Sequence, residues 1–286
     1  MSEPVAREVE AHTMHCMEIW GGNKAVESAI ATPGLDIYVY SAPYKDEDHG
    51  GDVHFVSLCG GGIITRLILA DVSGHGESVA SFSDGLRTLM RRNINNKSQK
   101  QLVRALNRQF TELAQMRRFA TALIATYLAT SDRLSVCNAA HPRPLWYRAE
   151  TGAWSLMTHE TTGSIDSPSN LPLGIDEEMN YDQSAVKLDT GDVVIFYTDA
   201  LMEAPSPSGA MLGEEGLLQI ARGVDRSDPA RLGRALVEAV ARHRGGVEAD
   251  DDVTLLVLHH NGGPPRRASI AEKVDVYAKV FGLKRV

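Results

Sequence analysis

The sequence has few cysteines and no long apolar run. Its three cysteines, Cys16, Cys59 and Cys137, are odd in number and widely spaced. This pattern argues against a disulfide framework and a cysteine-based zinc site, and it favours a reducing compartment. No run of about 18 apolar residues is present to span a bilayer, and the polar, acidic stretch 1–10 does not look like a signal peptide. We therefore expect a cytoplasmic protein that does not associate with membranes.

The sequence also lacks an excess of basic residues. It carries 29 Lys and Arg against 37 Asp and Glu, for a net charge of −8. Nonspecific nucleic-acid binding depends on clustered positive charge, so we expect no nucleic-acid partner. The short basic stretch 264–267 follows two glycines and is typical of a solvated linker.

The spacing of apolar residues predicts one large α+β domain. Antiparallel runs of strands with helices inserted in pairs are typical of a layered β-sandwich, with two mainly antiparallel sheets flanked by helices. Expected strands cover 35–40, 54–58, 63–70, 120–130, 134–138, 145–148, 154–158, 186–188, 193–197 and 252–259, and expected helices cover 77–93, 101–116, 216–221 and 229–243. We assign 1–34 as an N-terminal extension with a short helix over 5–20, 35–260 as the domain, and 261–286 as a C-terminal extension.

Acidic residues stand at the ends of several expected strands. Asp52 follows two glycines, Asp71 and Asp199 each follow an apolar run, and 250–252 is a run of three aspartates before the last strand. A carboxylate at the exit of a buried strand points an anionic oxygen out of a rigid scaffold. Hard divalent cations take oxygen ligands, so these positions indicate a site for two such ions.

Other residues have simpler explanations. Asp189 and Asp192 have the spacing of turn residues, and Asp252 is expected to fix its loop beside Asp251. The glycines at 60–62 predict a hairpin turn, because no Lys-Ser/Thr pair follows them as in a phosphate-binding loop. His141 has no second histidine or other partner, which favours a structural role, and no base adjoins Ser73 to make it a nucleophile.

Seven short motifs occur in a fixed order over residues 50–258, and together they resemble one family. They are Gly50-Gly51-Asp52, Ala70-Asp71-Val72-Ser73-Gly74-His75-Gly76, Phe119-Ala120-Thr121-Ala122, Asn138-Ala139-Ala140-His141-Pro142, Pro172-Leu173-Gly174, Gly191-Asp192 with Tyr197-Thr198-Asp199, and Asp251-Asp252-Val253-Thr254. The set is similar to the metal-dependent type 2C (PPM) protein phosphatases, in the bacterial branch of sporulation stage II protein E and the sigma-factor regulator phosphatases.

The resemblance implies a site with two Mn²⁺ or Mg²⁺ ions at one end of the sandwich. Asp71 would bridge both ions, Asp52 and the Val72 carbonyl would hold one, and Asp199 with Asp251 would hold the other. A water between two divalent ions is acidified enough to attack a phosphate monoester near neutral pH, so no protein nucleophile is needed. We therefore take Asp71 and Asp199 as the catalytic carboxylates.

The implied function is that of a protein-serine/threonine phosphatase. Its substrate would be a small regulatory phosphoprotein such as an anti-sigma-factor antagonist, and control would come from a partner protein or a homodimer. The alternative is a catalytically weak binding module with the same fold in a partner-switching system. Intact carboxylates at the four positions favour the enzyme.

The chain departs from the family pattern at four positions. Alanine replaces the usual glycine at Ala140 and Ala200, and such a replacement costs about 1 kcal/mol if the position needs a positive φ. The eukaryotic branch has a phosphate-binding arginine before its first metal carboxylate, and only Lys45 lies in that neighbourhood here. We do not assign His75 as the general acid, because Ser73 occupies the place of the histidine proposed for that role.

Overall fold

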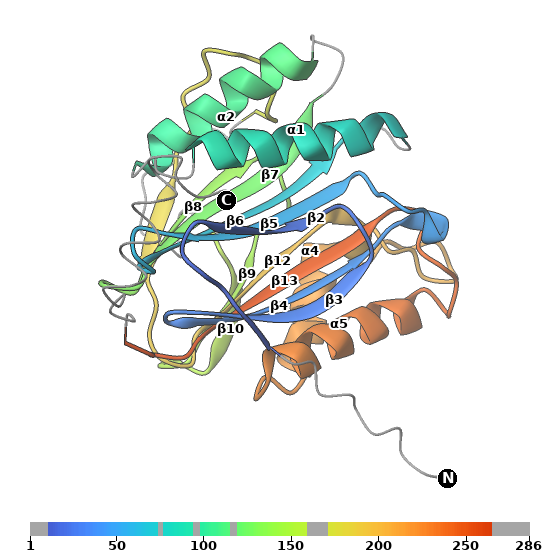
Figure 1. The fold of residues 1–286 in the computed structure, drawn as a ribbon. Helices are drawn as coiled ribbons and strands as arrows, with labels where there is room; N and C mark the ends of the chain where they lie inside the picture. The colour runs from blue at the N-terminus through green and yellow to red at the C-terminus, as the bar shows by residue number, and fades with distance from the viewer. Residues whose placement is uncertain (1–10, 74–76, 94–97, 115–118, 159–170, 265–286) are drawn as a thin grey trace.

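Two β-sheets lie face to face in the computed structural model, and a pair of helices covers the outer face of each sheet (Figure 1). The structure describes residues 11–73, 77–93, 98–114, 119–158 and 171–264. Within these ranges, no helix is both long and apolar enough to cross a membrane. The α+β layered sandwich expected from the sequence is confirmed.

One sheet has seven strands, in the order β1-β3-β4-β13-β12-β9-β10. Neighbouring strands are antiparallel, except that β1 runs parallel to β3. The strands are β1 (Ala11–Thr13), β3 (Val26–Thr32), β4 (Leu35–Ala42), β9 (Leu145–Arg148), β10 (Ala153–Leu156), β12 (Val193–Tyr197) and β13 (Val253–His260).

The other sheet has six antiparallel strands, in the order β11-β8-β7-β6-β5-β2. They are β2 (Glu18–Gly22), β5 (Asp52–Cys59), β6 (Ile64–Val72), β7 (Ala120–Leu128), β8 (Arg133–Ala139) and β11 (Ser184–Lys187). Strands β5 and β6 form the hairpin expected at 60–62, where Gly60, Gly61 and Gly62 all have positive φ.

The four main helices match the expected ones within a few residues. Helices α1 (Glu77–Asn93) and α2 (Gln99–Ala114) cover the six-stranded sheet, and α4 (Gly213–Arg222) and α5 (Pro229–His243) cover the seven-stranded sheet. Helix α5 begins after Asp228, whose side chain accepts a hydrogen bond from the Arg231 N–H, with Pro229 in the first turn. Two 3₁₀ turns, η1 (Tyr44–Asp46) and η2 (Asp199–Leu201), complete the described elements.

The short helix expected over 5–20 is wrong in its described part, because residues 11–20 contain strands β1 and β2. Their hydrogen-bond partners, β3 and β5, are distant enough that the local apolar pattern does not show the pairing. Strands β1, β2 and β3 all come from the segment assigned to the N-terminal extension, and they pair within the two sheets.

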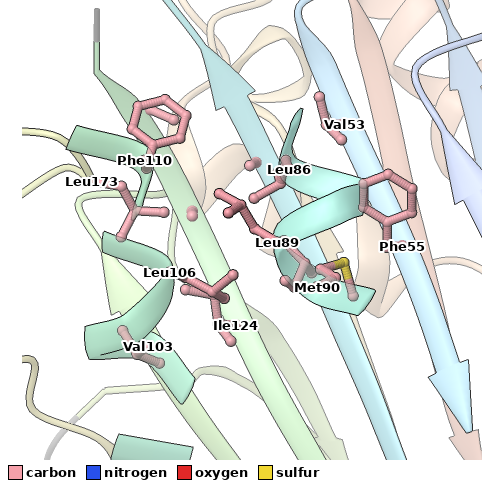
Figure 2. Close-up of a cluster of buried hydrophobic side chains, with 14 of the residues drawn as sticks. Val53, Phe55, Leu86, Leu89, Met90, Val103, Leu106, Phe110, Ile124 and Leu173 are labelled. Carbon is pink, nitrogen blue, oxygen red and sulfur yellow. The ribbon is translucent and has the colours of Figure 1, made fainter. Parts of the chain in front are cut away.

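Three layers of apolar side chains hold the sandwich together. Figure 2 shows the layer under α1 and α2, where Leu86, Leu89 and Leu106 from the helices meet Phe55 and Ile124 from the sheet. A second layer lies between the sheets, and a third lies between the seven-stranded sheet and α4 and α5. This close-packed scaffold positions the loops at both ends of the sandwich.

Candidate active site

The β5–β6 hairpin places two of the expected ligand residues side by side. Asp52 opens β5, and Asp71 is directly opposite it near the end of β6. Directly opposed residues of antiparallel strands have Cβ atoms about 5 Å apart. The pairing is set by the register of the hairpin, because a slip of one residue would send the two side chains to opposite faces.

Strands β12 and β13 bring the other two carboxylates to the same end. Asp199 begins η2 just after β12, and Asp251 lies two residues before β13. A hydrogen bond joins the two sheets here, because the Thr198 Oγ1–H donates to Asp52 Oδ2 at 2.8 Å. The Thr254 N–H donates to Thr198 Oγ1 at 3.0 Å, which ties β13 to the same hydroxyl.

Asp252 holds the loop that carries Asp52, as expected. Its Oδ1 accepts from the Tyr44 N–H at 2.6 Å, and its Oδ2 accepts from the N–H groups of Gly51 and, at 3.2 Å, Asp52. The side chain is buried, whereas Asp251 is exposed. A Cβ at Gly50 would lie 2.6 Å from Asp252 Oδ2, which explains the glycine in this motif.

The carboxylates at this end destabilise one another's charged forms. Burial and the charges of Asp199, Asp251, Asp252 and Glu203 raise the pKa of Asp71 to about 7. Burial and the Asp71 and Asp252 charges raise the pKa of Asp52 well above its usual range. The pKa of Asp199 is raised as well, by burial and then by Glu203 and Asp251.

These oxygen donors match the chemistry of a hard divalent cation, which would offset the repulsion that raises the pKa values. Among the described residues, no three Asp, Glu, His or Cys side chains already converge on one point. The donor set therefore fits a metal through its backbone positions and its uncompensated charge.

Two further residues singled out in the sequence have structural contacts. Ser73 Oγ accepts from the Phe119 N–H at 3.1 Å and so ties β6 to the start of β7. His141 is buried, its Nδ1 lies 2.8 Å from Thr121 Oγ1, and burial lowers the pKa of its ring to about 3. This agrees with the structural role expected for His141. His75 falls outside the described residues.

The two alanines that replace family glycines differ in conformation. Ala140 has a φ of 55°, in the region that favours glycine. Ala200 is absent from the described residues of positive φ, so alanine introduces no strain there. Its carbonyl accepts from Arg244 Nη2 at 2.8 Å.

Sequence reasoning missed two contributors to this end of the sandwich. Glu203 lies four residues after Asp199, and its negative charge helps to raise the pKa values of Asp71 and Asp199. This i, i+4 spacing from Asp199 was the only sequence feature that could have indicated Glu203. Asn23 donates from Nδ2 to the Gly50 carbonyl at 2.9 Å and accepts from the Gly50 N–H at its own carbonyl at 2.8 Å. No local pattern links residues 23 and 50.

The chain is similar in sequence and in structure to several known proteins. Over 142 residues, the chain is 30% identical to the phosphoserine phosphatase RsbP of Bacillus subtilis, covering 48% of this chain and 33% of RsbP. The RsbU and RsbW domains of Rv1364c from Mycobacterium tuberculosis superpose with a TM-score of 0.69 at 25% identity, over 91% of this chain and 70% of that chain. The PP2C phosphatase domain of SpoIIE from Bacillus subtilis superposes with a TM-score of 0.65 at 17% identity, over 80% and 64% of the two chains.

The fold is therefore that of the type 2C serine/threonine phosphatases, as the motifs suggested. Within this class, the chain belongs to the stage II sporulation protein E (SpoIIE) family, whose model matches residues 64–261. The chain spans about a third of the length of RsbP.

Proposed function

We propose that this protein is a divalent-metal-dependent phosphatase that removes phosphate from serine or threonine of a small regulatory protein. The observation that carries the proposal is the pairing of Asp52 with Asp71 on adjacent strands, where burial and the neighbouring acidic groups raise the pKa of Asp71 to about 7. Burying several carboxylates together is costly unless a cation neutralises them.

The metal ligands proposed are those expected from the motifs. Asp71 pairs with Asp52 on the neighbouring strand and precedes the Val72 carbonyl, and it is within reach of the charges of Asp199 and Asp251. When bound, two Mn²⁺ or Mg²⁺ ions would supply an acidified water and offset the charge on the phosphoryl oxygens. Thr198 orients Asp52 by its hydrogen bond, and Asp252 holds the backbone at Gly51 and Asp52.

A phosphoprotein substrate suits the surroundings of the site. A pocket of about 340 Å³ adjoins Asp251 and is lined in part by Tyr44, Lys45 and Arg244. The Lys45 ammonium lies 4.7 Å from the centre of the Tyr44 ring. These groups could receive residues that flank a phosphoserine. The relative RsbP is a phosphoserine phosphatase, which supports a phosphoserine substrate, and we propose that this substrate is an anti-sigma-factor antagonist.

The second candidate is a catalytically weak phosphatase-fold module that binds a partner in a partner-switching system. One observation favours this candidate: among the described residues, no three acidic side chains converge on one point that could hold a metal ion. The absence of an arginine before Asp52, where only Lys45 is near, also favours weak phosphate binding.

Hydrolysis of p-nitrophenyl phosphate and of a phosphoserine peptide separates the two candidates. We expect the purified chain to hydrolyse both with Mn²⁺, and to lose this activity with a chelator or with the Asp71→Asn substitution. No rate above the chelated control at several pH values would reject the enzyme and leave the binding module.

Four narrower points stay predictions. They are the cytoplasmic location, control by a partner protein or a homodimer, the choice between Mn²⁺ and Mg²⁺, and the division into an extension over 1–34, a domain over 35–260 and a second extension over 261–286.

A further inference from the structure

A second hollow of about 500 Å³ lies at the β2 edge of the six-stranded sheet, apart from the four carboxylates. Strand β2, the turn that follows it, strand β5 and helix α1 all contribute to its wall, including Trp20, Gly22, Lys24, His54 and Arg87. Its volume falls within the range of small-molecule sites, roughly 300–1,000 Å³. The proposed phosphatase chemistry uses none of these five side chains.

Aromatic rings form one part of the wall. The Trp20 and His54 rings have centroids 5.7 Å apart and are tilted by 45°. Trp20 is half-buried, and His54 is only 1% exposed, with no hydrogen-bond partner for its buried Nδ1. A flat ring stacks well on such a surface.

Positive charge forms another part of the wall. Arg87 uses Nη2 to donate to the Ile19 carbonyl at 3.3 Å, while its buried Nε has no partner. The one acidic residue of the wall, Glu18, is already engaged by His12 Nε2 at 2.7 Å and by the His15 N–H at 2.7 Å. Neither Arg87 nor Lys24 has an ion pair within the described ranges of the chain, so this wall favours an anion.

The Gly21-Gly22 pair shapes the hollow. Gly21 has a φ of 119°, and a Cβ there would lie 2.2 Å from the His54 carbonyl oxygen, so the close approach of β2 to β5 needs glycine. Gly22 is different, because a Cβ there would have nothing within 4 Å. A larger residue at Gly22 would therefore enter open space without backbone strain.

We propose that this pocket binds a small organic anion with a flat aromatic ring. The ring lies against Trp20, which is backed by the buried His54, and the carboxylate or phosphate of the ligand pairs with Arg87 and Lys24. Arg87 supplies a charge-assisted hydrogen bond from Nε, for which the protein itself offers no acceptor.

Occupancy of this pocket is sensed at the carboxylate end through Asn23, which lines it. Asn23 makes two hydrogen bonds to Gly50, and the N–H groups of the next two residues, Gly51 and Asp52, both bind Asp252. A ligand that orders the turn after β2 therefore also orders Asp52, and it should tighten divalent metal binding. This coupling rests on the proposed metal site, whereas anion binding does not.

The binding test uses 2-naphthoate as the probe and the full chain with a chelator present, so that it is independent of phosphatase activity. We expect saturable binding by calorimetry, with quenching of Trp20 fluorescence. The uncharged 2-naphthamide should bind about tenfold more weakly, since a charge-assisted hydrogen bond is lost.

Matched variants locate the probe. Arg87→Gln should weaken 2-naphthoate about tenfold, and Gly22→Val should remove most binding by filling the hollow. Arg91→Gln is the control, because Arg91 is exposed on the same helix and does not line the pocket. Absence of saturable binding, or equal affinity in Arg87→Gln, Gly22→Val and the parent chain, would overturn the proposal.

The coupling test compares 2-naphthoate affinity with and without saturating Mn²⁺. We expect Mn²⁺ to tighten the probe about fivefold, and by linkage the probe should tighten Mn²⁺ by the same factor. Asn23→Ala should reduce this factor towards one. Equal probe affinity with and without Mn²⁺ would refute the link to the carboxylate end.

Discussion

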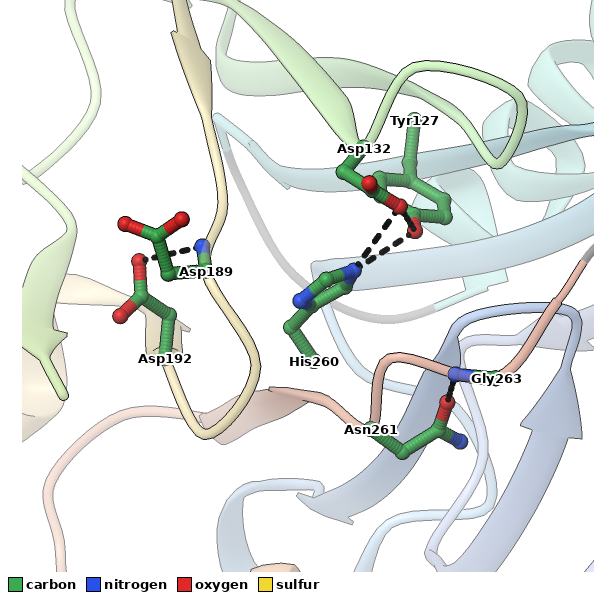
Figure 3. Close-up of polar contacts among 7 residues, drawn as sticks. All are labelled: Tyr127, Asp132, Asp189, Asp192, His260, Asn261 and Gly263. Carbon is green, nitrogen blue, oxygen red and sulfur yellow. Dashed lines mark hydrogen bonds and ion pairs between the residues drawn. The ribbon is translucent and has the colours of Figure 1, made fainter.

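The two ends of the β-sandwich both carry aspartates at strand ends, but the ends differ in how many hydrogen-bond donors these aspartates have. At the far end, where β7 and β13 finish, His260 Nε2 lies 3.0 Å from Tyr127 Oη and 3.2 Å from Asp132 Oδ1, and the Tyr127 hydroxyl donates to the same Asp132 oxygen (Figure 3). Close to this network, Asp192 accepts hydrogen bonds from the N–H groups of Asp189 and Ala149 (Figure 3 draws the first).

The near end of the sandwich is the one that carries Asp52, Asp71, Asp199 and Asp251. Hydrogen-bond donors to these carboxylates are few there, and negative charge accumulates. Asp52 accepts one side-chain hydrogen bond from Thr198, while Asp71 faces the charges of Asp199, Asp251, Asp252 and Glu203. The near end also has its own structural aspartate, Asp252, which binds three N–H groups. A strand-end aspartate that several hydrogen-bond donors surround thus has a structural role. A strand-end aspartate with few such donors is available to bind a ligand.

The largest expected effect comes from Asp71→Asn. Loss of the central carboxylate should lower metal-dependent phosphatase activity by more than about 100-fold, since ligand changes exceed the 10- to 100-fold cost of changing a supporting residue. The chelated variant should unfold at a higher temperature than the parent, because one repelling charge is gone. Steady-state kinetics and thermal melts measure both.

Asp189→Asn is the control at the far end, where Asp189 is exposed, and it should change neither quantity. Similar activity in Asp71→Asn and the parent would end the functional distinction between the two ends.

The second prediction concerns metal and pH. Asp71 has a pKa of about 7 in the folded chain against an ordinary 3.8, so the folded state retains a proton that the unfolded state releases between these values. The free energy of unfolding of the chelated protein should therefore fall as pH rises from about 4 to 7, by on the order of 3 kcal/mol.

Mn²⁺ or Mg²⁺ should reverse this loss by binding the deprotonated carboxylates, so the metal-induced rise in melting temperature should grow over the same pH range. Melting curves at pH 5, 6 and 7 with and without metal provide the measurement. A melting temperature that metal leaves unchanged at pH 7 would count against a cation site at the near end.

The third prediction pairs the structural aspartates of the two ends. Asp252→Asn and Asp192→Asn should each lower the free energy of unfolding by about 2 kcal/mol, since each leaves buried N–H groups without a carboxylate acceptor. Only Asp252→Asn should also raise the Mn²⁺ concentration for half-maximal stabilisation, because Asp252 holds the backbone of Asp52. Urea titrations at several Mn²⁺ concentrations distinguish the two, and equal metal midpoints would show that Asp252 does not position Asp52.

The smallest expected effects are at the two alanines. Ala140→Gly should raise the free energy of unfolding by about 0.5–1 kcal/mol, since it relieves a φ of 55°. Ala200→Gly should lower it by a similar amount, since glycine there adds only unfolded-state entropy. The same sign of change in both variants would contradict the conformations observed at these positions.

Most of the elements were predictable because their signals are local. The amphipathic period placed helix α5 at Pro229–His243, and Gly60, Gly61 and Gly62 marked the β5–β6 turn. The order of the motifs likewise identified Asp52, Asp71, Asp199 and Asp251 as a candidate set before any geometry was known. Strands β1, β2 and β3 were missed. Strands β1 and β2 are short edge strands, which depend on partners rather than on their own period, and β3 pairs with β1 and β4.

Sequence alone thus determined the helices, the hairpin and the family of the chain. Tertiary structure decided which aspartates meet at one end and which of them are held by hydrogen bonds, because the contacts that set this, such as Thr198 to Asp52 and Gly51 to Asp252, join residues 146 and 201 positions apart. It also decided that Ala140 takes a positive φ and Ala200 does not. Such features follow from the simultaneous packing of both sheets, which no local period encodes.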